Sequence, residues 1–81
     1  MEDKKIEIFD KPKRGFFCFQ PKWRKHSEIG FLWRLTRNDG KVPVLIHGVL
    51  NNDKGQRVFL FSPLAIPNLK RMAREDFFEV F

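Results

Sequence analysis

The chain has 81 residues, of which 42% are hydrophobic and 32% are charged, with a formal net charge of +6. This length allows one modest hydrophobic core, so we expect a single folded domain over residues 1–81, and the hydrophobic content excludes a disordered charged tail. No run of about 18 apolar residues suggests a membrane span, and one cysteine, Cys18, cannot form an internal disulfide. We expect a soluble, cytoplasmic protein without a membrane partner.

Two short strands are expected before residue 21. "KKIEIF" alternates Ile6 and Ile8 with charged residues, which is the period of a half-buried strand. "DKPKRG" then turns the chain, and "GFFCFQ" forms the second strand, which ends before Pro21.

The next segments predict a hairpin and a further strand. "IGFLWRLTR" (29–37) reads as the clearest strand, because its odd positions Ile29, Phe31, Trp33 and Leu35 form one apolar face and Arg34 and Thr36 lie on the other. "NDG" (38–40) suits a tight turn, so this strand should pair with "KVPVLIHGVL" (41–50), in which Gly48 marks a bulge. The turn "NNDKG" then leads into the strand "QRVFLF".

Beyond Ser62 the apolar residues follow a helical period. Spacings of three and four relate Leu69, Met72, Ala73, Phe77 and Val80, and Pro67 suits a first helical turn. The expected fold is therefore α+β: a small antiparallel β-sheet or partly closed barrel of four to five strands with one C-terminal α-helix. The Phe-rich end, "DFFEVF", should dock on the core, cover a sheet edge or form a homodimer.

Positive charge and aromatic rings are combined in residues 11–27, which carry six Lys or Arg, four large aromatics and no acid. Single-stranded nucleic acid is bound by cations along its phosphates and by rings against its bases. We predict that the cations of such a site are Lys11, Lys13, Arg14, Lys22, Arg24 and Lys25, with Arg34 and Arg37 extending the track and Phe16 or Trp23 stacking on bases. Alternatively, the aromatic rings fill the core of the protein and the Lys and Arg residues lie in a solvated loop.

The charges of the expected helix add two candidates. Lys70 and Arg71 lie near its start, where free backbone amides already attract phosphate. The alternative is that Arg71 pairs with Glu75 one turn later, which would contribute only a few tenths of a kcal/mol.

A local resemblance supports nucleic-acid binding. "KIEIFDKPKRGFFCF" resembles the first two strands of a cold-shock domain and preserves Lys5, Phe9, Gly15 and Phe16, while Phe17 replaces a glycine and Cys18 a second stacking Phe. "VFLFSPLAI" is similar to a later segment of that family, although it lies farther along the chain than in the family. The resemblance implies a small nucleic-acid-binding barrel.

The preferred hypothesis is a basic, non-enzymatic RNA- or DNA-binding domain that favours single strands. The rival is a small regulator or inhibitor whose basic, Phe-rich surface binds an acidic patch on a partner protein. A third hypothesis is an RNA-cleaving toxin that uses His26 or His47 as general base, although no local motif supports it. Two histidines and one cysteine cannot complete a tetrahedral zinc site, so we expect neither a metal nor a cofactor.

Overall fold

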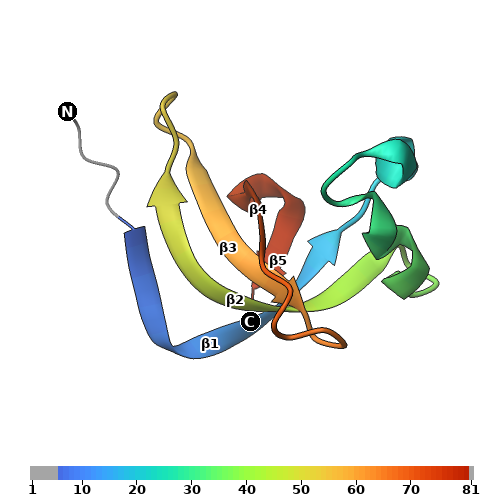
Figure 1. Cartoon of the computed structure of the whole chain (residues 1–81), viewed down its shortest axis with the longest axis horizontal. Coiled ribbons are helices and arrows are strands. Elements are labelled where there is room, and N and C mark those ends of the chain that lie inside the picture. The colour runs from blue at the N-terminus through green and yellow to red at the C-terminus, as the bar shows by residue number, and fades with distance from the viewer. Residues whose placement is uncertain (1–5, 81) are drawn as a thin grey trace.

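A single antiparallel sheet organises the computed structural model, which describes residues 6–80. Its five strands have the order β4-β3-β2-β1-β5, and the sheet curls into a half-barrel (Figure 1). The strands are β1 (Ile6–Cys18), β2 (Lys41–Asn51), β3 (Arg57–Pro63), β4 (Arg71–Arg74) and β5 (Phe78–Val80). Within the described residues the helices are three short 3-10 turns, η1 (Pro21–Lys25), η2 (Gly30–Leu35) and η3 (Glu75–Phe77).

Strand β1 replaces the two strands expected before residue 21. Ile8 lies opposite Gly48 and Lys13 lies opposite Ile46, so residues 9–12 form an irregularity between two paired stretches. Pro12, which has no amide to donate, falls in this irregularity, where the ladder with β2 is interrupted. The expected turn at residues 10–15 is thus a bend within one strand. Residues 4 and 5 of the first expected strand lie outside the described residues.

The predicted C-terminal α-helix is wrong, and with it the α+β class. Residues 71–80 form β4, η3 and β5 instead, with β4 paired to β3 and β5 paired to β1. Ala73 lies opposite Phe59, and Phe78 lies opposite Phe17. The two strands extend both edges of the curled sheet, and this pairing outweighs the helical spacing of the apolar residues.

The strand predicted at residues 29–37 is also wrong, because this segment contains η2. Ile29 and Leu32 are buried and lie three residues apart, so the same apolar residues fit a 3-10 turn. Gly30 packs closely against η1: a Cβ there would lie 2.5 Å from the carbonyl oxygen of Arg24. In addition, β2 and β5 already flank the C-terminal half of β1, which leaves no edge there for another strand.

The turns around β2 were predicted more accurately. The segment after Asn51 joins β2 to β3, with Gly55 at a φ of +76°. A register shift between Ile46 and Gly48 confirms the bulge near Gly48. Gly40 has a φ of +78° as expected for "NDG", although the turn connects η2 rather than a strand to β2.

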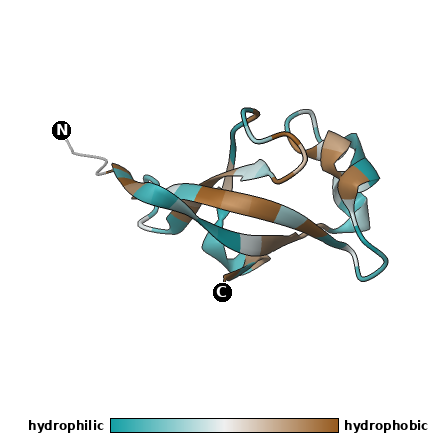
Figure 2. Ribbon diagram, turned by 90° about the horizontal axis from the view of Figure 1, so that it is seen from below, coloured by the Kyte–Doolittle hydropathy of each residue, from teal (hydrophilic) through white to brown (hydrophobic). Residues whose placement is uncertain are grey.

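The core lies on the inner face of the curled sheet, and in Figure 2 stretches of hydrophobic residues run along the long strands. Its buried members are Phe17, Phe19, Ile29, Leu32, Val42, Val44, Ile46, Phe59 and Phe61. Phe78 joins this cluster, with its ring centroid 5.1 Å from that of Phe17 and 5.0 Å from that of Phe61. The C-terminal aromatic segment therefore docks on the core and extends one sheet edge.

Candidate nucleic-acid interface

The site residues predicted from sequence lie in three places. Lys11, Lys13 and Arg14 are exposed around the bend of β1, with Phe16 two residues beyond Arg14. Lys22, Trp23, Arg24, Lys25, Arg34 and Arg37 lie in the segment that contains η1 and η2. Arg71 begins β4 and Lys70 directly precedes it. Figure 1 shows η1 and η2 at the opposite end of the long axis from the first residues of β1.

Trp23 is half-buried and packs against the core rather than presenting an open ring. It stacks on Phe17, with 5.6 Å between ring centroids, and makes an edge contact with Phe77 at 4.7 Å. No other apolar residue follows Pro21 in η1, so Trp23 anchors this turn to the sheet while Lys22, Arg24 and Lys25 remain exposed.

Trp33 is the exposed ring that the sequence analysis missed. Its side chain is 43% exposed, and the guanidinium carbon of Arg24 lies 4.8 Å from its ring centroid. The alternating pattern assigned Trp33 to the buried face of a strand. In the 3-10 turn, Leu32 takes the buried position and Trp33 faces solvent.

A cleft lies beside Trp33, between η1 and the turn that precedes β2. Its cavity volume is about 160 Å³, and its lining includes Pro21, Arg24, Trp33, Arg37 and Asn38. Arg37 also lies over Phe16, with 5.3 Å from its guanidinium carbon to the ring centroid. The fold thus brings two predicted arginines, Arg24 and Arg37, to one cleft with an aromatic wall.

We call residues 20–40 the basic lobe, because they carry five Lys or Arg and two acids. One acid, Asp39, accepts a hydrogen bond from the backbone amide of Lys41 at 3.1 Å. The other, Glu28, lies in the connection between η1 and η2. The excess of cations around an exposed indole gives the lobe an anion-attracting surface.

Lys70 and Arg71 do not form the expected helix-terminal phosphate site, since no α-helix begins there. Arg71 donates from Nε to the carbonyl oxygen of Glu28 at 3.0 Å and lies over Phe31, 5.6 Å from its centroid. It therefore ties β4 to the connection between η1 and η2. The expected partner of Arg71, Glu75, instead pairs with Arg57 at 3.1 Å.

His47 and Ser62 form a hydrogen bond of 2.6 Å between Nε2 and Oγ. Burial lowers the pKa of His47 from its ordinary value, and the positive charge of Lys70 lowers it further. Ser62 is fully buried, so its hydroxyl is not open to a substrate. This pair stabilises the contact between β2 and β3.

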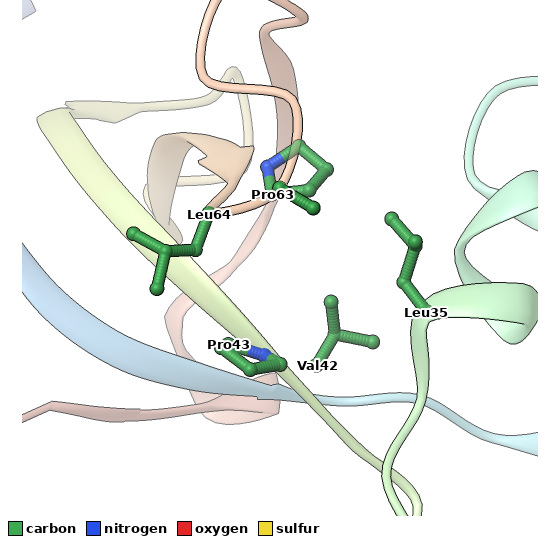
Figure 3. Close-up of a pocket in the computed structure, with 6 residues that line it drawn as sticks. Leu35, Val42, Pro43, Pro63 and Leu64 are labelled. Atoms are coloured by element: carbon green, nitrogen blue, oxygen red, sulfur yellow. The ribbon is translucent and has the colours of Figure 1, made fainter.

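An apolar cavity lies between η2, β2 and the end of β3. This cavity of about 270 Å³ is lined by Leu35, Val42, Pro43, Pro63, Leu64 and Ala65 (Figure 3). Leu35 from η2 and Pro63 from the end of β3 lie on opposite sides of Val42, and the lining residues have only apolar side chains. It therefore offers no group for a phosphate or a base edge. Among residues 6–80, no cluster of three or more His, Cys, Asp or Glu is arranged to hold a metal ion.

Comparison with known proteins identifies no relative: no family model, curated protein or solved structure matches the chain. The cold-shock resemblance thus stays confined to its short segments, and the two strands that it implied are one bent strand here. In the described part of the chain, no helix has the length and apolar character needed to cross a bilayer.

Proposed function

We propose that this chain is a non-enzymatic binding domain for single-stranded nucleic acid and that the basic lobe is its binding surface. The observation that carries this proposal is the cleft in which the exposed Trp33 stands beside Arg24 and Arg37. An unpaired base stacks on the indole, while the two guanidinium groups contact the adjoining phosphates.

The chemistry favours single strands over duplexes. A base can stack on a side chain only when its face is free, and in a duplex neighbouring bases cover that face. Arginine suits this role because its planar guanidinium can stack on a ring and donate two parallel hydrogen bonds to a phosphate. Binding of this kind tolerates many sequences, because every base has a π face.

The rest of the bound nucleic acid can follow a path along β1. Arg14 and Phe16 are two residues apart on a strand, so they share its outer face, and Arg37 lies over Phe16. Phosphates leaving the cleft can follow Arg37 to Arg14 and then to the exposed lysines at the bend, Lys11 and Lys13. In this proposal Trp23 supports the lobe from the core, and Arg71 holds it to β4.

The test is fluorescence anisotropy with labelled single-stranded RNA, single-stranded DNA and duplex DNA of equal length at two salt concentrations. Trp33→Ala should weaken single-strand binding by about 5- to 150-fold, the range that corresponds to the loss of one stacked base. Affinity should fall steeply with salt, since each neutralised phosphate releases counterions.

A matched pair of double variants separates local from general charge. Arg24→Ala with Lys25→Ala removes two cations from the basic lobe, whereas Lys54→Ala with Arg57→Ala removes two at the β2–β3 hairpin. We expect the first pair to weaken binding much more than the second. Equal losses of affinity in the two double variants would indicate a non-specific attraction of the oligonucleotide to positive charge. The absence of binding at low salt would overturn the proposal.

A further inference from the structure

A second surface of the molecule has a different character from the basic lobe. Neighbouring strands place Ile8, Gly48, Leu60 and Met72 in one row across β1, β2, β3 and β4. Two residues along, the next row of the same face contains Ile6, Leu50, Val58 and Arg74. The row between them, which includes Phe59 and Ala73, faces the core, so these two rows lie on the outer face.

Six of these eight residues are large and apolar, and we call Ile6, Ile8, Leu50, Val58, Leu60 and Met72 the outer apolar patch. Ile8 is 60% exposed, and Ile6 and Met72 are each 56% exposed. Val58 is buried, at 9% exposed, and Leu50 and Leu60 are half-buried, so the exposed part of the patch consists mainly of Ile6, Ile8 and Met72. A contiguous set of aliphatic side chains on a sheet usually marks an association surface.

Gly48 lies in the same row as Ile8 and lets β1 approach β2 closely. A Cβ on Gly48 would lie 2.5 Å from the carbonyl oxygen of Glu7 and 3.1 Å from Cδ1 of Ile8. The side chain of Ile8 therefore leans over Gly48. A glycine is required here because β1 approaches β2 so closely.

Charge indicates which partner fits. Arg74 is the one charged residue in the two rows, where it forms an exposed ion pair with Asp76 at 3.3 Å, and Arg14 lies on the same face opposite Leu45. A second copy would bring the same arginines and another net charge of +6 against the first, which disfavours self-association. An apolar segment with acidic flanks would instead bury its side chains on the patch and complement these arginines.

We propose that the outer apolar patch binds an acidic amphipathic helix of a partner protein. Such a helix presents apolar residues at spacings of three and four to the patch and directs its carboxylates toward Arg74 and Arg14. Apart from Arg14, which also lies on the proposed path of the phosphates, this surface is separate from the proposed nucleic-acid site, so the chain would join a nucleic acid to a protein.

The probe is a synthetic peptide of about 18 residues, long enough to fold as a helix on a surface, with leucines on one face and glutamates elsewhere. A control peptide carries lysines in place of the glutamates. Binding is followed by amide chemical shifts of the isotopically labelled full chain. The acidic peptide should shift residues of the patch, and the lysine peptide should bind about tenfold or more weakly.

The test variant is Ile8→Thr with Met72→Gln, which removes apolar surface without changing charge. It should weaken acidic-peptide binding by about tenfold or more and leave oligonucleotide binding unchanged. Leu64→Gln alters another exposed apolar residue, outside both rows, and should leave peptide affinity unchanged. The double variant Arg24→Ala with Lys25→Ala should also leave peptide affinity unchanged. A failure of peptide binding can therefore be distinguished from a failure of nucleic-acid binding.

Three outcomes would overturn the inference. Peptide-induced shifts confined to the basic lobe would show that glutamates are merely attracted to its cations. Equal binding by wild type and Ile8→Thr with Met72→Gln would remove the patch from the interaction. A dimer in sedimentation that the same double variant dissolves would identify a second copy as the occupant.

Discussion

The turns η1 and η2 are close in sequence and each carries one tryptophan, yet they use these tryptophans in opposite ways. In η1, Trp23 packs against Phe17 and Phe77, whereas in η2 Trp33 is 43% exposed beside Arg24. This difference in exposure follows from the other apolar residues within each turn. η1 has no other large apolar side chain to bury, but η2 buries Leu32 and half-buries Phe31 and Leu35. A basic, aromatic composition therefore does not reveal which ring faces solvent.

The largest expected contrast is between the two tryptophan variants. Trp23→Ala should destabilise the fold by roughly 2–4 kcal/mol, because truncating a packed aromatic leaves a cavity in the core. Trp33→Ala should cost less than about 1 kcal/mol, as is usual for an exposed position. Urea unfolding of both variants measures the difference. Similar losses of stability in the two variants would show that Trp33 is a structural residue like Trp23.

A smaller effect tests the packing of η1 against η2. Gly30→Ala places a Cβ 2.5 Å from the carbonyl oxygen of Arg24, so the turns must separate, at a cost of roughly 1–3 kcal/mol. Because this movement displaces Arg24 from Trp33, oligonucleotide affinity should fall although no charge is lost.

Gly55→Ala is the matched control for this substitution. Its φ of +76° makes alanine unfavourable by about 1 kcal/mol, but a Cβ there would meet no atom within 4 Å. Stability should therefore fall while oligonucleotide affinity is retained. Equal affinities for the Gly30 and Gly55 variants would mean that the spacing of η1 and η2 does not shape the site.

The smallest predicted effect concerns His47, which lies outside the basic lobe. Burial lowers its pKa in the folded state, so below its ordinary value of about 6.5 the unfolded chain binds more protons than the folded chain. Its contribution to stability is complete above that pH and is lost as the pH falls toward the folded pKa.

Unfolding measured between pH 7.5 and 5 should show this loss on acidification, and His47→Gln should flatten it. Gln removes the titrating group and keeps an amide that can reach Ser62. A pH dependence unchanged in this variant would remove His47 as its source.

Part of the fold could be predicted from sequence, because its signals are local. The runs that became β2 and β3, the hairpin containing Gly55 and the bulge near Gly48 depend on alternation and turn residues. The helix expected around Met72 and Ala73 failed because the pairing of β4 with β3 is a long-range contact. The same limitation explains η2, where spacing alone fits either a strand or a 3-10 turn.

The sequence predicted the cations of the candidate site but not its exposed ring, Trp33. Arg24 and Arg37 belong to the predicted track, and they meet at a cleft because the chain folds back through η1 and η2. Trp33 could have been identified only by recognising that Ile29, Leu32 and Leu35 share a period of three. Lys70 and Arg71 were predicted to bind phosphate at the start of a C-terminal helix. The structure has strand β4 there, so this reason for their role is wrong.

The fluorescence of Trp33 reports whether its indole stacks on an unpaired base. In a Trp23→Phe variant, which keeps an aromatic ring in the core, Trp33 is the sole tryptophan of the chain. Titration with single-stranded RNA or DNA should quench its emission in parallel with the rise in anisotropy, and added salt should reverse both changes. Binding that leaves the Trp33 emission unchanged would contradict the account.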